Sequence, residues 1–382
     1  MSKAKFTHYD LKLAEPSFGS DLTDLIIELD YLRKKQLSGS THPMVFSQLK
    51  QIFHMLESIG SARIEGNNTT VAEFIETKLE NNPDVSSGIR EILNLEKAMA
   101  YLEDNVNEYH FDRKFLIGLN ELITAGLPSE EGVAFTGSYR KLNVSITGAA
   151  HMPPGHDLVE GYMQELLDFI NHPDSSKYDL IKMAIVHHRF VWIHPFSDGN
   201  GRTVRMLTHA MLMRFGFGGG AGRIVNPTAV FCIDRNAYYS HLAAADQGTD
   251  EGILQWCWYV LQGLKVEMEK IDRLLDYNYL KKEILLPTLA YSLERKYITD
   301  VEAKILKRAI DKPVIQASDI KEFFVGQDNA IISRQIKKLI EKKMLMPERE
   351  GARKYLIRFD NNFLLRGIIK SLSEKGFLPI KD

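Results

Sequence analysis

The chain has 382 residues, of which 44% are hydrophobic and 26% charged, and its formal net charge is −2. This is the composition of a globular protein of two or three domains, and so small a charge excludes attraction of the whole chain to nucleic acid or membranes. No apolar run is long enough to span a bilayer, and the N-terminal residues lack the apolar core of a signal peptide. Two cysteines do not make a disulfide framework. We therefore expect a cytoplasmic protein with no membrane partner.

The first third of the chain has the apolar spacing of helices. Ser86 and Asp112 precede two of the apolar runs, where a side-chain oxygen can cap the first free N–H groups of a helix. Gly66 follows another run and can end it. The apolar residues recur at helical intervals over 22–32, 45–59, 71–79, 89–99 and 115–123. This part of the sequence predicts a helical bundle.

The pattern changes at residues 136–148, where short alternation lies between glycines. Such alternation predicts a β-hairpin. An exposed strand edge can hold any extended peptide through main-chain hydrogen bonds. The alternative is a hairpin with a purely structural role.

The stretch 194–205 reads His-Pro-Phe-Ser-Asp-Gly-Asn-Gly-Arg-Thr-Val-Arg and lies between two helical runs. Pro195 ends the first helix by removing an N–H and restricting the residue before it. Gly199 and Gly201 permit backbone angles that turn successive N–H groups into one concavity. Because this concavity opens onto the N-terminus of the next helix, it favours an anion.

Four side chains of this stretch add chemistry to the anion site. Arg202 and Arg205 supply fork-shaped donors that match phosphate oxygens. Asp198 would repel a phosphate unless a hard cation lay between them, which indicates Mg²⁺. His194 supplies a base beside the site. Together they predict a nucleotide-phosphate site with its own base, and the alternative is a structural corner between two helices.

The stretch 194–205 resembles the motif of the Fic family, His-Pro-Phe-x-Asp/Glu-Gly-Asn-Gly/Lys-Arg-x-x-Arg, and matches it at every specified position. The resemblance implies an enzyme that transfers AMP from ATP to a Ser, Thr or Tyr hydroxyl of a protein, with Mg²⁺ as cofactor. The roles that it implies are proton acceptor for His194, Mg²⁺ holder for Asp198, phosphate cradle for Gly199, Asn200 and Gly201, and outer-phosphate donors for Arg202 and Arg205.

A second short pattern lies upstream. Ser61 and Glu65 are four residues apart, so they share a helix face, and Gly66 follows. This resembles the inhibitory motif of the Fic family, Ser/Thr-x-x-x-Glu-Gly/Asn. The resemblance implies that a helix over about 45–66 brings Glu65 to Arg205 and inhibits transfer. The alternative is a solvated glutamate near a helix end.

Two further segments resemble functional parts of that family. Residues 137–148 resemble the flap that holds a target protein. The segment after Asp234 resembles one in which an Asn and a Tyr contact the nucleoside, which implies Asn236 and Tyr239. Core packing remains the alternative for these two residues, because aromatic side chains dominate protein cores.

The C-terminal part predicts helices at 301–310, 318–324 and 329–342, followed by two strands within 345–357. This order resembles a winged helix-turn-helix. Arg334, Lys337 and Lys338 on the third helix could contact DNA. A protein-binding or dimerising module is the open alternative.

We predict a mainly α protein: a Fic-fold helical bundle with a β-hairpin flap, and a small C-terminal winged helix-turn-helix (α+β) domain. The alternatives for function are a DNA-binding regulator whose Fic part senses nucleotide, and an enzyme that removes AMP or transfers another nucleotide. Self-modification and a homodimer are left open. The predicted boundaries are 1–110 for an N-terminal helical region, 111–265 for the catalytic core, 266–300 for a helical linker and 301–382 for the C-terminal domain.

Overall fold

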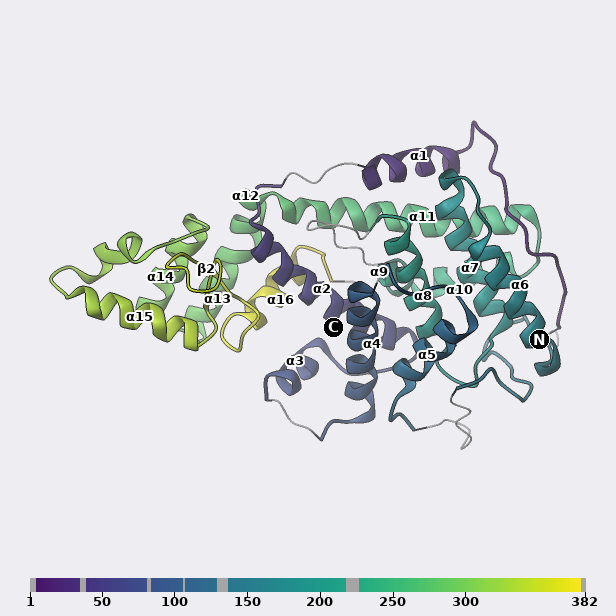
Figure 1. Cartoon of the computed structure of the whole chain (residues 1–382), viewed down its shortest axis with the longest axis horizontal. Coiled ribbons are helices and arrows are strands. Elements are labelled where there is room, and N and C mark those ends of the chain that lie inside the picture. Colours follow the sequence, from purple (N-terminus) through teal and green to yellow (C-terminus); the bar gives the residue numbers. More distant parts are fainter. Residues whose placement is uncertain are drawn as a thin grey trace. The chain divides into compact units, whose positions relative to one another are not determined.

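The structure of the chain is a computed structural model that describes residues 5–34, 39–80, 84–105, 107–128, 137–217 and 227–378. These residues form two compact units (Figure 1). The first unit takes its residues from Met1–Gln36, His54–Thr69 and Asp84–Met268, and the second from Leu37–Phe53, Thr70–Pro83 and Glu269–Asp382. The domain boundaries given above stay a prediction.

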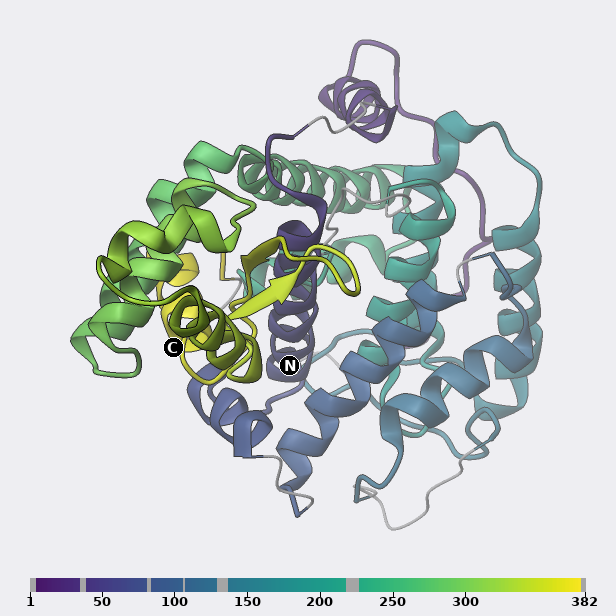
Figure 2. The same cartoon turned by 60° about the vertical axis from the view of Figure 1, so that its left-hand side comes forward.

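The first unit is built from helices, as Figures 1 and 2 show. Two of its helices, α2 (Pro43–Ile64) and α11 (Asp250–Asp272), also contribute residues to the second unit. The others are α1 (Asp21–Lys34), α4 (Ser87–Asp104), α5 (Arg113–Thr124), η1 (His156–Leu158), α6 (Val159–Asn171), η2 (Ser176–Tyr178), α7 (Asp179–Ile193), α8 (Asn200–Arg214), α9 (Pro227–Cys232) and α10 (Arg235–Ala245). The predicted mainly helical fold is confirmed.

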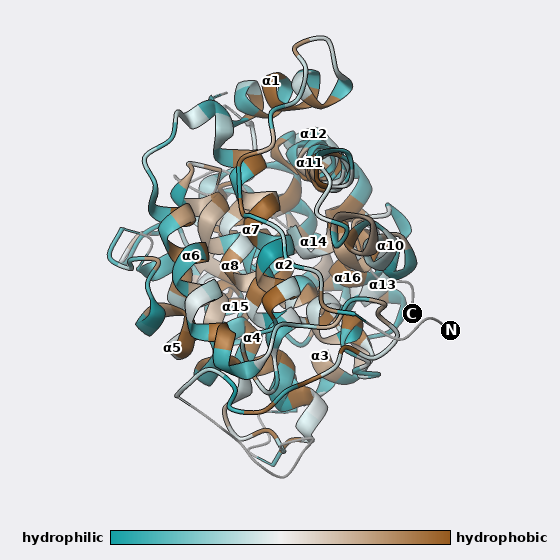
Figure 3. Cartoon of the chain, turned by 90° about the vertical axis from the view of Figure 1, so that its right-hand side faces the viewer, coloured by the Kyte–Doolittle hydropathy of each residue, from teal (hydrophilic) through white to brown (hydrophobic). Residues whose placement is uncertain are grey.

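Helices α7 and α8 form the centre of this unit. Helix α7 packs against α6 and α8, and α8 also packs against α4 and α5. Their side chains are buried around most of the circumference, including Phe190, Trp192, Val204 and Leu207. Both helices therefore lie in the core, although their buried side chains also include charged ones such as Arg202 and Arg205. Figure 3 shows both hydrophilic and hydrophobic residues on the surrounding helices. The loop between α7 and α8 therefore has two rigid supports.

The capping residues and the glycine that the sequence predicted lie at helix ends in the structure. Ser86 accepts a hydrogen bond from Ile89 N at 3.3 Å at the start of α4, and Asp112 accepts one from Phe115 N at 2.7 Å at the start of α5. Gly66, with φ of 97°, follows the end of α2. Such a positive φ is open to glycine at little cost, so it can reverse the chain after the helix.

The second unit has helices and one small sheet. Strands β1 (Leu345–Pro347) and β2 (Tyr355–Ile357) pair antiparallel, with Leu345 opposite Ile357. The helical elements besides parts of α2 and α11 are α3 (Val71–Glu80), η3 (Arg273–Leu275), α12 (Tyr277–Tyr279), the π-helical η4 (Leu280–Leu285), α13 (Leu286–Glu294), α14 (Asp300–Asp311), η5 (Ala317–Phe324), α15 (Asn329–Glu341) and α16 (Leu365–Glu374).

The C-terminal elements follow the predicted order of three helices and two strands. Helix α14 begins with a capping box, in which Thr299 and Glu302 satisfy each other's backbone N–H groups. The second helix, η5, is a 3₁₀-helix. Helix α16, which packs against α13, was not predicted. The winged-helix assignment itself stays a prediction.

The β-hairpin predicted at 136–148 is wrong for its described part, residues 137–148, which form no strand. Backbone and side-chain groups there bond to other segments. Arg140 N donates to Pro195 O at 2.8 Å, and Asn143 Oδ1 accepts from His156 N at 2.8 Å. The segment is an extended loop with turns, and these bonds attach it to other parts of the chain.

Among the helices of the described residues, none has the length and apolar character of a membrane span.

Candidate functional site

The loop between α7 and α8 holds its shape through backbone angles and one amide side chain. His194 and Gly199 have φ of 53° and 77°, both in the left-handed region. Asn200 Oδ1 accepts from Phe196 N, and its Nδ2 donates to Phe196 O, each at 2.8 Å. A histidine in the left-handed region is uncommon and needs such support. The loop is therefore a fixed structure.

Arg140 supports the same loop from the side. Its Nε donates to the carbonyl oxygen of His194 at 2.8 Å, and its Nη2 donates to that of Pro154 at 2.5 Å. Arg140 is buried, with 2% of its surface exposed. Its guanidinium thereby fixes the backbone of His194. Nothing in the spacing of the sequence marked Arg140 for this role.

The His194 imidazole is suited to accept a proton. Burial lowers the pKa of His194 to about 4, although a backbone bond to Val191 and the charge of Glu65 act to raise it. The ring is therefore neutral at pH 7. A neutral imidazole has one nitrogen that can accept a hydrogen bond or a proton.

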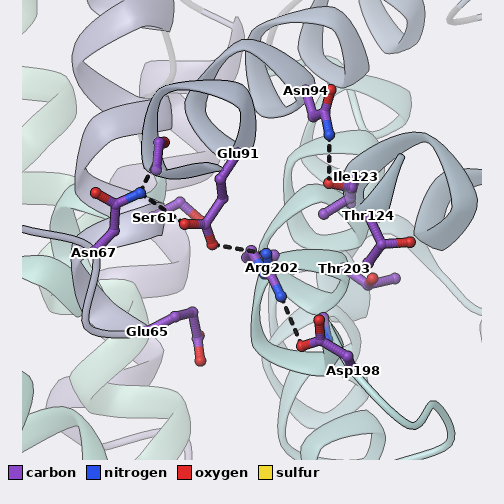
Figure 4. Close-up of polar contacts among 12 residues, drawn as sticks. Ser61, Glu65, Asn67, Glu91, Asn94, Ile123, Thr124, Asp198, Arg202 and Thr203 are labelled. Carbon is purple, nitrogen blue, oxygen red and sulfur yellow. Dashed lines mark hydrogen bonds and ion pairs between the residues drawn. The ribbon is translucent and has the colours of Figure 1, made fainter. Parts of the chain in front are cut away.

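Asp198 in the loop before α8, Arg202 on α8 and Glu91 on α4 form a row of charged groups. Asp198 Oδ1 accepts from Gly199 N and from Arg202 Nη2, the latter at 2.7 Å, while Asn120 donates to Asp198 O at 3.0 Å. Arg202 Nη1 donates to Glu91 Oε1 at 2.7 Å. Figure 4 shows Arg202 between the two carboxylates. Glu91 and Asn120 were missed in the sequence, because neither lies near the motif in the chain.

Arg205 is held by the end of α2. Its Nε donates to Ser61 Oγ at 2.8 Å, and its Nη2 donates to Ser61 O at 2.9 Å and to Glu65 Oε1 at 2.7 Å. Only 1% of the Arg205 side chain is exposed, against 34% for Glu65. The structure thus joins Ser61, Glu65 and Arg205, the residues that the family resemblance brought together.

Gly201 lets the Glu65 carboxylate reach α8. A Cβ at this position would lie 2.1 Å from Glu65 Oε1. A side chain at this position would force the Glu65 carboxylate to move, so glycine allows the carboxylate to lie against the first turn of α8. The N-terminus of α8, with its free N–H groups and positive dipole end, therefore faces an anion.

The Glu65–Arg205 pair is ionised. Burial alone would raise the pKa of Glu65, but the charge and hydrogen bond of Arg205 outweigh it and the pKa is lowered. Burial likewise acts against the charge of Arg205, but Glu65 raises the pKa of that group overall. Each group thus keeps the other charged, as expected of an ion pair with good geometry and one buried partner.

Asn236 and Tyr239 lie on α10, and both are exposed. Tyr239 OH accepts from Arg235 Nε at 3.2 Å. Within the described residues, no hydrogen bond joins either side chain to the stretch 194–205. Their neighbour Tyr238 is buried, and its hydroxyl oxygen lies 3.0 Å from His187 Nε2.

The residues present can bind a divalent cation whose other ligands are mostly phosphate oxygens and water. No group of three His, Cys, Asp or Glu side chains gathers in the described part of the chain. Asp198, with 35% of its side chain exposed, has Oδ1 hydrogen-bonded to Gly199 N and Arg202 Nη2, whereas no group among the described residues donates to Oδ2. Mg²⁺ commonly binds one or two carboxylates together with phosphates and water, so one free carboxylate oxygen fits it.

Residues 110–212 match the Fic/DOC family. Proteins named protein adenylyltransferase Fic are similar to the chain: 33% identical over 209 residues in Culex quinquefasciatus and 31% identical over 200 residues in Drosophila willistoni. The alignments cover 52% and 51% of this chain and 37% of each relative. The chain thus spans little more than a third of the length of the curated relatives it matches.

Two solved structures have the same fold. A Fic family protein from Desulfovibrio desulfuricans G20 aligns with a TM-score of 0.52 and 20% identity, over 88% of this chain and 94% of that one. A Fic domain containing signaling protein from Bacteroides thetaiotaomicron aligns with a TM-score of 0.54 and 18% identity, over 67% of this chain and 97% of that one.

Proposed function

We propose that the chain is a Fic family enzyme that transfers AMP from ATP to a Ser, Thr or Tyr hydroxyl of a protein. The observation that supports the proposal most is the internal anion at the N-terminus of α8. The Glu65 carboxylate lies against Gly201 and 2.7 Å from Arg205. A place where an arginine holds an anion beside a helix N-terminus is suited to a phosphate. The names of the relatives add AMP transfer as the reaction.

In the proposed reaction, His194 takes the proton from the target hydroxyl while the hydroxyl oxygen attacks the α-phosphorus of ATP. A new O–P bond forms, the bond between the α-phosphorus and its bridging oxygen breaks, and pyrophosphate leaves. His194 suits this role because its pKa of about 4 keeps the ring neutral. Transfer of this kind depends mainly on position and charge neutralisation.

The remaining motif residues position the nucleotide. Gly199, Asn200 and Gly201 would cradle the phosphates at the start of α8, and Arg202 and Arg205 would hold the outer ones. Asp198 would hold Mg²⁺, which when bound neutralises phosphate charge. Asn236 and Tyr239 would contact the nucleoside from α10, where both side chains are exposed.

Glu65 would inhibit this reaction by occupying the outer-phosphate position. Its bond to Arg205 at 2.7 Å takes the donor that an outer phosphate would need. ATP could bind by its adenosine, but its α-phosphate would lie out of line with the hydroxyl. Small errors of position cost orders of magnitude in rate. The chain should therefore transfer little AMP until Ser61, Glu65 and Gly66 move away.

The target protein would dock on residues 137–148. These residues form no strand with each other, and an extended segment can bind a peptide through those main-chain groups that are not already bonded. Leu142, with 53% of its surface exposed, would contact the peptide. Modification of the chain itself is the simplest form of this reaction, and a homodimer could offer one copy as the target of another.

The alternative function for the chain is that of a DNA-binding regulator rather than an enzyme. On α15, Lys337 lies 3.8 Å from Glu341, and Lys338 lies 3.6 Å from Glu302. Acidic partners weaken a basic face, and DNA binding depends on such a face. We therefore favour the enzyme, and a protein-binding module over a DNA-binding one for the region 301–382. Removal of AMP, or transfer of another nucleotide, would use the same residues.

The test is transfer from α-labelled ATP, UTP, GTP and CTP in the presence of Mg²⁺ and cell lysate. Glu65→Gly should label proteins from ATP, and Glu65→Gly/His194→Ala should not. Equal labelling by both variants would contradict the role of His194. If another nucleotide labels proteins better than ATP does, the transferred group is the monophosphate of that nucleotide and not AMP.

A further inference from the structure

Glu91 lies on α4, outside both the motif and the inhibitory segment, yet it contacts residues next to each. Its Oε1 accepts from Arg202 Nη1 and its Oε2 from Asn67 Nδ2, both at 2.7 Å (Figure 4). The side chains of Glu91 and Arg202 are 13% and 7% exposed. Since a carboxylate this buried loses much of its hydration, such a position needs bonded partners of this kind.

Arg202 is shared between Glu91 and Asp198. Its Nη2 donates to Asp198 Oδ1 at 2.7 Å, so its two terminal nitrogens go to different carboxylates. The three groups carry a net formal charge of −1. Arg202 thus binds one oxygen of each carboxylate. In the described part of the chain no donor reaches the other oxygen of Asp198, Oδ2.

We propose that Glu91 is a positioning residue that draws Arg202 partly away from Asp198 and so leaves Asp198 able to hold a divalent cation on the nucleotide phosphates. The inference rests on the proposed function for its ligand, ATP with Mg²⁺. Without the Glu91 charge, Arg202 would have Asp198 as its one carboxylate partner in the described residues. Arg202 and Asp198 together would then be neutral. Because a fork-shaped guanidinium can bind both oxygens of a carboxylate, Arg202 could then occupy both oxygens of Asp198.

The loss of Glu91 therefore has opposite consequences with and without the metal. A cation is attracted less by a neutral group than by one with a charge of −1, so Mg²⁺ should strengthen ATP binding less. Bare ATP, which is an anion, should bind as well as before or better, because one carboxylate fewer competes for Arg202. A merely structural role would weaken binding under both conditions.

Asn67 sets the position of Glu91. Its Nδ2 also donates to Gly88 O at 2.9 Å, and its Oδ1 accepts from Thr69 N at 2.9 Å. The amide is thus fixed by three partners, and it follows the inhibitory segment directly in the chain. Asn67→Ala should therefore reproduce the effect of losing Glu91 in a weaker form, because it frees Glu91 without removing the charge.

The test is calorimetric titration of ATP into Glu65→Gly and Glu65→Gly/Glu91→Gln, in Mg²⁺ and in EDTA. We expect the gain in affinity from Mg²⁺ to be roughly ten-fold smaller in the double variant, the size expected for loss of one charge near a partly exposed site. Affinity in EDTA should be unchanged or higher. An equal gain from Mg²⁺ in both variants would overturn the inference, and so would equal weakening in Mg²⁺ and EDTA.

Three controls accompany the titration. Glu103→Gln removes another carboxylate of α4, one that pairs with His54 at 3.0 Å, and should leave the gain from Mg²⁺ unchanged. Glu91→Asp keeps the charge and should retain more of the gain than Glu91→Gln; equal losses would count against the proposal. In an Arg202→Ala background, Glu91→Gln should not increase ATP affinity in EDTA.

The titration also separates this inference from the proposed reaction, because ATP binding is measured without transfer. If no nucleotide is transferred but the Mg²⁺ result holds, the reaction is wrong and the inference stands. If AMP is transferred and the gain from Mg²⁺ does not change, the inference alone fails.

Discussion

Replacing Glu65 by glycine should release Arg205 and activate AMP transfer. Arg205 is 1% exposed and bonds to Glu65 at 2.7 Å. A hydrogen bond between charged groups contributes about 1.5–3 kcal/mol, which corresponds to roughly 10- to 150-fold in rate if the phosphate regains it in the transition state. Because about a third of the Glu65 side chain is exposed (34%), solvent screening favours the lower end. We expect an increase of at least ~10-fold.

The assay is incorporation of label from α-labelled ATP by wild type, Glu65→Gly, Arg205→Ala and Glu65→Gly/Arg205→Ala. The double variant should lose the increase, because Arg205 is the group that the first substitution releases. Glu76→Gly is a matched control: Glu76 pairs with Arg366 in the second unit and should not activate transfer. If Glu65→Gly is no more active than wild type, residues 61–66 are an ordinary helix end and the inhibition model is wrong.

Further predictions use the activated Glu65→Gly variant or the full chain. His194→Ala should abolish transfer and leave ATP affinity in calorimetry nearly unchanged, because the base acts on the hydroxyl; transfer at the parent rate would remove His194 from the mechanism. Asp198→Ala should weaken ATP binding in Mg²⁺ more than in EDTA, and equal affinities of variant and parent in Mg²⁺ would contradict its role. Since a base works when unprotonated and the pKa of His194 is lowered to about 4, kcat should stay level as pH falls to about 5 and drop below that; a drop centred near 6.5 would refute the depressed pKa. In a gel shift at low salt the full chain should not retain genomic DNA, because Lys337 and Lys338 have acidic partners; retention that salt abolishes steeply and Arg334→Ala weakens would support the DNA-binding alternative.

The sequence predicts those parts of the fold that local chemistry determines. Asp112 and Ser86 cap their helices because a side-chain oxygen needs only the next few N–H groups. Gly66 ends α2 and Gly199 precedes α8 with positive φ, as glycines at helix ends often do. Helix α16 could have been predicted as well, because its apolar residues recur at helical spacing; they include Leu365, Ile368, Ile369 and Leu372.

The parts that the sequence does not predict depend on contacts between distant segments. Arg202 bonds to Glu91, which lies 111 residues earlier, and no spacing rule relates the two. The predicted hairpin at 136–148 fails for the same reason, because Arg140 bonds to Pro195 and His194 across the fold. Alternation of residue types indicates extended backbone, but the partner of that backbone is set by tertiary packing.

The Glu65–Arg205 pair came from the family resemblance, and the structure has it at 2.7 Å. Spacing alone placed Ser61 and Glu65 on one helix face. It could not indicate which arginine they would meet, because α2 and α8 are separated by more than a hundred residues in the chain. The roles of these residues in inhibition remain a prediction for the assays above.

Intact-protein mass spectrometry tests the central proposal, AMP transfer, most directly. Glu65→Gly should be incubated with ATP and Mg²⁺, alone and with lysate proteins, beside Glu65→Gly/His194→Ala. We predict that Glu65→Gly gains the mass of AMP on itself or adds it to a lysate protein at a Ser, Thr or Tyr, and that the His194 variant does neither. If Glu65→Gly adds no AMP to any protein, or if His194→Ala adds as much, the proposal is contradicted.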